Sequence, residues 1–130
     1  MEARLDLIGL VVADMAASLA FYRLLGFDIP AEADSEPHVE VELPGGLRLA
    51  WDRVDVVRSF DPDWNPPSGG HRVALAFRCP GPAEVDAAYE RLVKAGHPGR
   101  KEPWDAFWGQ RYAIVHDPDG TAVDLFSPLG

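Results

Sequence analysis

At 130 residues, with 47% hydrophobic and 25% charged residues, the chain has the length and composition of one globular domain. No apolar run approaches the roughly 20 residues of a membrane-spanning helix, and the first residues carry no signal-peptide pattern. The net charge of −9 argues against a nucleic-acid partner. The single cysteine, Cys79, excludes an intrachain disulfide and indicates the reducing cytoplasm.

The first half of the chain predicts a strand over 4–12, a helix, and two further strands. Asp14 is a good N-cap and Gly26 suits the position after a helix, so a helix is expected between them. Residues 38–43 alternate polar and apolar side chains, as in a half-exposed strand, and a Pro-Gly-Gly turn leads into another strand over 47–53.

The stretch that follows contains Asn65-Pro66-Pro67 and Gly69-Gly70, so an irregular segment is expected there. It is longer than an ordinary connection and carries Phe60 and Trp64. It is therefore either a plain linker or a functional loop that walls a pocket.

The second half predicts a strand over 72–79 and a helix from Pro82 to Gly96, with Val93 among the residues that face inward. An aromatic loop is expected over 104–110. Strands over 111–115 and 121–126 follow, and Asp117-Pro118-Asp119-Gly120 between them suits a type I turn.

The two halves repeat each other. Residues 20–25 match residues 88–93 in pattern, and a glycine follows each helix. This spacing predicts a duplicated βαβββ module, with modules at about 1–54 and 71–130 joined by a loop at about 55–70.

Three motifs, in this order, resemble the vicinal oxygen chelate superfamily, which includes glyoxalase I, extradiol dioxygenases and bleomycin-resistance proteins. They are the opening strand and helix at 7–27, the strand at 73–77 with its helix ending at Lys94-Ala95-Gly96, and the closing hairpin at 111–126. The resemblance implies an α+β fold in which two βαβββ modules form a cupped mixed sheet. Among the family's members, the metal-free drug-binding resistance proteins are the most similar.

In metal-using members, the resemblance implies four ligands, two from each module. The first-strand position falls at Leu7, which cannot coordinate a metal, and the position opening the second module falls at Arg72, whose guanidinium repels a cation. The last position falls at Asp124, a possible oxygen ligand. Arg72 and Asp124 are expected to face one cavity, either as an internal ion pair or as polar anchors for a ligand.

The remaining position lies on the strand over 47–53, which offers Leu49 or Trp51, while Asp52 is expected on the other face. We therefore expect no metal and no other cofactor. A rearranged site that joins Asp124 to His71 or His116 stays open as the alternative.

Aromatic side chains crowd the strand ends and loops, more than one core needs. The predicted ligand-binding residues are Trp51, Phe60, Trp64, Arg72, Trp104, Phe107, Trp108, Tyr112 and Asp124. The same aromatics also suit a dimer interface, and in the resistance proteins that the chain resembles, ligand grooves lie between two subunits.

The expected function is metal-independent binding of a bulky aromatic small molecule by a cytoplasmic homodimer, with antibiotic sequestration as self-resistance the concrete version. No catalytic residue is assigned, and neither nucleic acid nor membrane is expected as a partner. Two enzymatic alternatives remain: a metal-dependent lyase, isomerase or dioxygenase, and a cofactor-free enzyme with Asp124 as general base. A domain whose aromatics serve only dimerisation is a further possibility.

Overall fold

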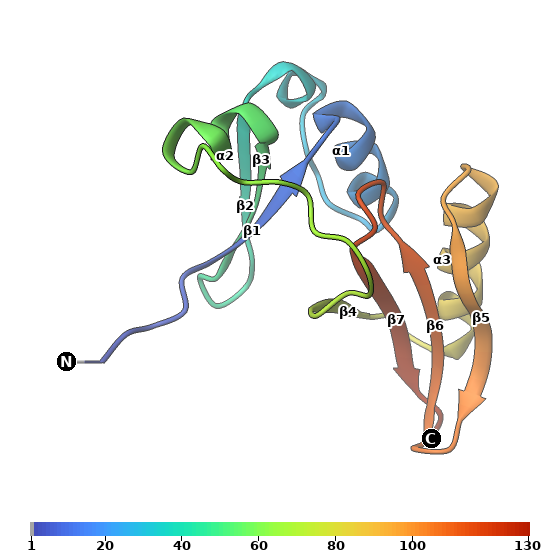
Figure 1. Ribbon diagram of the computed structural model, residues 1–130. Coiled ribbons are helices and arrows are strands. Elements are labelled where there is room, and N and C mark those ends of the chain that lie inside the picture. The colour runs from blue at the N-terminus through green and yellow to red at the C-terminus, as the bar shows by residue number, and fades with distance from the viewer. Residues whose placement is uncertain (1) are drawn as a thin grey trace. The chain divides into compact units, whose positions relative to one another are not determined.

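The computed structural model describes residues 2–130, which cluster into two compact units (Figure 1). Unit 1 comprises Met1–Ala20 and Asp28–Pro67, and unit 2 comprises Phe21–Phe27 and Ser68–Gly130. Each unit has its own sheet, so each is described by itself.

Unit 1 is built on a three-stranded sheet in the order β1-β3-β2. β3 pairs in parallel with β1 and antiparallel with β2. The elements in chain order are β1 (Leu7–Val12), α1 (Met15–Leu24), the 3₁₀ helix η1 (Ala31–Ser35), β2 (His38–Glu42), β3 (Arg48–Arg53) and α2 (Val54–Phe60).

Both predicted ends of α1 are confirmed. The backbone N–H of Ala17 donates to Asp14 Oδ1 at 3.1 Å, which satisfies one of the free donors of the first turn. At the other end Gly26 adopts a φ of 108°, and the N–H of Phe27 bonds the carbonyl of Tyr22 at 3.3 Å. This closing geometry needs the left-handed backbone that glycine adopts without strain.

The expectation of an irregular segment throughout 54–70 was wrong, because Val54–Phe60 forms the helix α2. The prolines and glycines that motivated it all lie beyond Phe60, whereas the helix itself contains neither. The first strand is also shorter than predicted, since β1 begins at Leu7, where its pairing with β3 begins.

Unit 2 is a complete βαβββ module with sheet order β4-β7-β6-β5, in which β4 and β7 are parallel (Figure 1). Its elements are β4 (Ala74–Arg78), α3 (Pro82–Lys94), β5 (Gly99–Ala106), β6 (Gln110–His116) and β7 (Ala122–Pro128). Unit 1 has the same strand order with one strand fewer, because η1 stands where unit 2 has β5. The duplication is confirmed in topology, but among the described residues the first module is βαββ.

One predicted loop in unit 2 is a strand. Trp104 and Asp105 belong to β5 and pair with β6, so only Phe107 to Gly109 form the turn between these strands. The irregular register of β5, with shifts near Lys101, and its Pro103 hide the strand from a pattern search.

Helix α3 begins at Pro82, as predicted, and ends before Gly96. Val85 and Leu92 are fully buried against the sheet. Val93 was expected to face inward, but its side chain is 40% exposed. A helix of 3.6 residues per turn carries this position to the margin of the stripe that begins at Val85.

The predicted type I turn at 117–120 is confirmed and is held by one carboxylate. The N–H of Gly120 bonds the carbonyl of Asp117 at 3.0 Å. Asp117 Oδ1 accepts the backbone N–H groups of Asp119 and Thr121, at 3.0 and 2.9 Å. A short polar side chain at the first turn position characteristically makes such bonds, and they fix the β6–β7 hairpin.

Candidate functional site: an aromatic face on unit 2

Five aromatic side chains of unit 2 form one connected group, called here the aromatic cluster. Its members are Trp104, Phe107, Trp108, Tyr112 and Phe126. The rings of Trp104, Trp108 and Tyr112 meet edge to face, with centroids 5.3 to 5.9 Å apart. Tyr112 stacks on Phe126 at 6.3 Å. Such contacts add specific geometry to the burial of apolar area.

Strand register explains why these side chains meet. Trp104 pairs with Tyr112, and Tyr112 pairs with Phe126, and directly opposed residues of neighbouring strands share a face. The alternate positions Ala113, Val115, Val123 and Leu125 are fully buried. Since α3 packs on β5, β6 and β7, these alternate positions form the core beneath it. The aromatic cluster therefore lies on the face of the sheet turned away from α3.

The tip of the cluster is unusually exposed. Phe107 is 96% exposed and Trp108 is 48% exposed. The indole N–H of Trp108 donates to Gln110 Oε1 at 2.8 Å, which fixes the ring although half of it faces solvent. Apolar surface of this kind, held in one orientation, is typical of a binding site.

A polar pair lies on the same face. The hydroxyl of Tyr112 donates to Asp124 Oδ2 at 2.5 Å. Desolvation by burial, together with this carboxylate, raises the pKa of Tyr112 to about 12. At the edge of the sheet, the ammonium of Lys101 lies 5.0 Å from the centroid of the Trp104 ring, within the range of a cation–π contact.

Five of the predicted site residues thus lie together: Trp104, Phe107, Trp108, Tyr112 and Asp124. Sequence reasoning missed Phe126 and Lys101. Phe126 could have been predicted, because Asp124 and Phe126 are two residues apart on a strand and must share a face. Lys101 could not have been predicted, since it lies on the irregular strand β5.

Arg72 does not form the internal ion pair that was one of the two roles expected for it. It is exposed and precedes β4, and no ion pair joins it to Asp124 in the part of the chain that the structure describes. Asp124 accepts the Tyr112 hydroxyl instead. A neutral donor within the sheet thus bonds one oxygen of this carboxylate, where an arginine had been expected.

The other predicted aromatics belong to unit 1. Trp51 is fully buried in the core of that unit, so its indole has no exposed surface for stacking, contrary to its expected role as a pocket wall. Phe60 is 73% exposed at the end of α2. The guanidinium of Arg58 lies 6.0 Å from the ring centroid of Trp64, and Arg58 Nε bonds the Trp64 carbonyl at 3.1 Å.

The sheet of unit 1 corrects one expectation about the metal positions. Leu7 pairs with Arg48, so the residues of β3 on its face are Arg48, Ala50 and Asp52. The expected positions Leu49 and Trp51 point to the opposite, buried face. Asp52 was expected to point away from the side of Leu7, and that was wrong.

Asp52 is nevertheless engaged by another side chain. His38 Nδ1 lies 2.5 Å from Asp52 Oδ1, and His38 Nε2 lies 2.9 Å from Glu40 Oε2. Glu40 also accepts from Arg48 at 2.8 Å, and Arg48 reaches Asp6 at 2.6 Å. Hydrogen bonds to Glu40 and then Asp52 raise the pKa of His38. This network occupies the exposed face of the sheet.

The residues present do not fit a divalent metal ion. Between residues 2 and 130, no three His, Cys, Asp or Glu side chains are placed to hold one together. Of the positions implied by the metal-using proteins, Leu7 and Arg72 offer no lone pair. On β3, the carboxylate that lies on the side of Leu7 is Asp52, and it is bonded by His38. His71 and His116 belong to no such group either.

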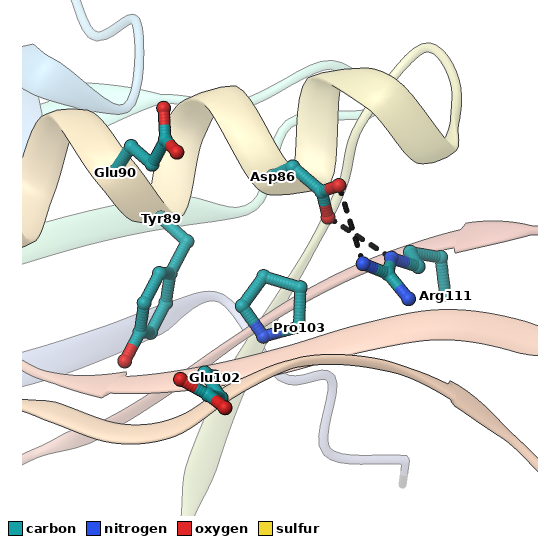
Figure 2. A pocket seen from close by; sticks show the side chains of 6 residues that line it. All are labelled: Asp86, Tyr89, Glu90, Glu102, Pro103 and Arg111. Atoms are coloured by element: carbon teal, nitrogen blue, oxygen red, sulfur yellow. Dashed lines mark hydrogen bonds and ion pairs between the residues drawn. The ribbon is translucent and has the colours of Figure 1, made fainter.

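A second hollow lies on the other side of the unit 2 sheet, between α3 and β5 (Figure 2). This cavity of about 280 Å³ is lined by Asp86, Tyr89, Glu90, Glu102, Pro103 and Arg111. Arg111 is already engaged. Asp86 accepts two hydrogen bonds from it, of 2.9 and 3.2 Å (Figure 2), and Asp105 accepts one of 3.1 Å. Four of its six lining residues are charged and its cation is paired, so it does not suit a wholly apolar ligand.

Comparison with known proteins agrees with this architecture. The model of the Glyoxalase/Bleomycin resistance protein/Dioxygenase superfamily matches residues 4–125. The chain belongs to this superfamily. No curated protein matches the chain.

Several solved structures share the fold. A glyoxalase/bleomycin resistance protein/dioxygenase from Nocardioides is 28% identical, with a TM-score of 0.74, over 99% of this chain and 85% of that chain. A family enzyme from Burkholderia phytofirmans PsJN is 19% identical, with a TM-score of 0.82, over 98% and 100% of the two chains. A glyoxalase-related enzyme from Fulvimarina pelagi is 26% identical, with a TM-score of 0.76, over 95% and 87%.

Of the helices in residues 2–130, none is both long and apolar enough to cross a bilayer.

Proposed function

We propose that the chain binds a bulky, mostly aromatic small molecule on the aromatic cluster of unit 2, without a metal and without turnover. The main support for this proposal is the exposure of Phe107 and Trp108, which lie at the tip of the cluster and pack against its other rings. Covering such rings with a ligand removes apolar surface from water, which lowers the free energy of the complex.

Burial of the exposed rings supplies the driving force for this binding. Covering about 100 Å² of apolar surface stabilises a complex by roughly 2.5 kcal/mol before the entropy of association is subtracted. A flat ligand that covers Trp108, Phe107 and part of Tyr112 buries more than this. Antibiotic sequestration is the concrete form, because stoichiometric capture protects a cell with no chemical step, and resistance proteins are one of the groups in the superfamily's name.

We also propose that the chain acts as a cytoplasmic homodimer. Exposed aromatic residues favour self-association as well as ligand binding, and the single free Cys79 suits a reducing compartment. Sedimentation velocity with and without ligand tests the dimer, and fractionation of the producing cells tests the compartment.

The binding proposal is tested by equilibrium dialysis of purified protein against planar aromatic compounds, followed by mass spectrometry of the recovered ligand. We expect saturable binding at one site per chain or per dimer and recovery of the compound unchanged. Quenching of tryptophan fluorescence should follow the same isotherm. Conversion of many molecules of the compound per protein chain would contradict the binding proposal and would show that the protein is an enzyme.

A further inference from the structure

Asp124 is the one acidic side chain that β4, β6 and β7 place on the face of the aromatic cluster. Its register partners are Ala76 on β4 and Ile114 on β6, so it lies in the middle of the sheet. Asp86 and Asp105 bond Arg111 on the α3 side of the sheet, and Glu90 and Glu102 line the hollow on that side. A ligand lying against the cluster therefore meets one carboxylate.

Half of that carboxylate is unused. Oδ2 accepts the Tyr112 hydroxyl, whereas Oδ1 makes no hydrogen bond within residues 2–130. Tyr112 also holds the group in a fixed orientation, since its own ring is packed by Trp104, Trp108 and Phe126. Asp124 is thus an oriented acceptor with one oxygen left for a donor.

The strand beside Asp124 carries two small side chains on the face of the cluster. Ala74 and Ala76 of β4 lie on this face, and both are exposed. Tyr112 and Phe126 lie on the other side of Asp124. A planar ring system that lies over the two alanines can therefore also touch the cluster.

The charges around this face indicate the sign of the charge on the ligand. Two cations lie at its margins: Arg78, which is exposed on the edge strand β4, and Lys101, whose ammonium rests over Trp104. Neither forms an ion pair with Asp124 in the described chain. Asp124 is central and half-buried, where charge interactions are screened less. The net charge of −9 also attracts cations.

We infer that the ligand of the aromatic cluster is a planar aromatic cation that donates an N–H to Asp124 Oδ1. This inference rests on the function proposed above and narrows it to one chemical class, in which Asp124 supplies both charge and direction. Tyr112 is a positioning residue, because it holds Asp124 and touches the ligand through its ring.

Four acridines of nearly equal size test this by equilibrium dialysis at pH 8. 9-Aminoacridine is a cation with N–H donors, 10-methylacridinium is a cation without them, acridine is neutral, and acridine-9-carboxylate is an anion. We expect 9-aminoacridine to bind most tightly, about tenfold or more ahead of 10-methylacridinium, since hydrogen bonds to charged groups carry that much free energy. Acridine should follow, and the carboxylate should bind most weakly.

Three variants locate the effect. Asp124→Asn should abolish the preference for 9-aminoacridine while leaving the affinity for acridine within about twofold. Glu102→Gln removes the same charge on the α3 side of the sheet, among the residues lining the second hollow, and should leave the preference intact. Tyr112→Phe keeps the carboxylate and should retain the preference for cations.

Equal affinity for all four acridines would overturn the cation inference while the binding function stood. Tightest binding of acridine-9-carboxylate would also overturn it and would make Arg78 and Lys101 the anchors. If no acridine bound, both proposals would fall. The comparison within the wild-type protein holds even if Asp124→Asn does not fold.

Discussion

The hydroxyl of Tyr22 donates a hydrogen bond of 2.7 Å to Asp117 Oδ2, joining two residues that are 95 positions apart in the chain. Both are buried, with Asp117 only 2% exposed. Asp117 Oδ1 holds the β6–β7 turn from within, so one carboxylate fastens both the hairpin and the end of α1 inside unit 2. Burial and the Asp117 carboxylate raise the pKa of Tyr22, so its proton stays on the hydroxyl.

Changing Tyr22 to Phe should lower the free energy of unfolding by about 1–3 kcal/mol, because Asp117 Oδ2 is then buried without this donor. Urea denaturation followed by circular dichroism measures the loss. Tyr89→Phe is the matched control, because it also removes one tyrosine hydroxyl but no hydrogen bond to a buried carboxylate. It should change the free energy of unfolding by less than about 0.5 kcal/mol. Equal losses in the two variants would contradict the assignment.

The stability of unit 1 should depend on the charge of His38. Both ring nitrogens face carboxylate oxygens, and a neutral imidazole can donate from only one of them. The folded pKa is raised by Glu40 and Asp52, so this stabilisation is complete below the unfolded pKa of about 6.5. It disappears as the pH rises through the folded pKa.

A His38→Gln variant should therefore lose less stability than the wild type between about pH 6.5 and the folded pKa of His38. Urea titrations at several pH values measure this, and an NMR titration of the imidazole protons gives the pKa directly. Parallel pH profiles for the two proteins would show that the network does not require the imidazolium. The effect is expected to be small, because the His38 side chain is 43% exposed.

Changing Trp108 to Ala should weaken binding of an aromatic ligand by about 1–3 kcal/mol while the fold remains intact. Trp108 is half-exposed and its loss opens no core cavity. Dialysis gives the affinity, and circular dichroism checks the fold. Trp64→Ala removes an indole from unit 1 and serves as the comparison. Unchanged affinity in Trp108→Ala, with or without a loss in Trp64→Ala, would remove the aromatic cluster as the binding surface.

The side chain of Tyr89 leaves no space for a Cβ at Gly99. A Cβ at this position would lie 2.1 Å from Tyr89 Oη and 2.8 Å from its Cζ, so Gly99→Ala forces Tyr89 to move. We expect a cost of about 1–3 kcal/mol. Adding Tyr89→Phe should restore part of it, because the nearer of the two contacts disappears. Thermal unfolding of the two single variants and the double variant measures this coupling. Strict additivity would place the strain elsewhere.

Local signals were enough for some elements. Asp14 and Gly26 mark α1, and the turn at Asp117 marks the closing hairpin, because the responsible bonds lie within a few residues of each other. The strand β5 was missed since its register is broken near Lys101 and its partner is supplied by β6. Propensity is a weak guide where tertiary pairing decides.

The site was recovered in part for the same reason. Trp104, Trp108 and Tyr112 are close in sequence, so aromatic crowding alone brings them together. The role of Trp51 was misjudged, because nothing within one strand says which face is covered. The ligand positions of metal-using relatives suggested that Arg72 and Asp124 face each other, but the hydrogen-bond partner of Asp124 is Tyr112. Tyr112 lies two residues along β6 from Ile114, which is the register neighbour of Asp124.

The bond from Tyr22 to Asp117 also bears on how such a protein arises by duplication. The sequence repeat divides the chain between two modules, but Phe21–Phe27 belongs to the compact unit of the second. A gene fragment encoding only residues 68–130 would lack the tyrosine that fastens its final hairpin. The sequence repeat and the compact units therefore have different boundaries in this protein. A chimaera that exchanges the second module with a relative keeps the bond from Tyr22 to Asp117 only when residues 21–27 are exchanged with it.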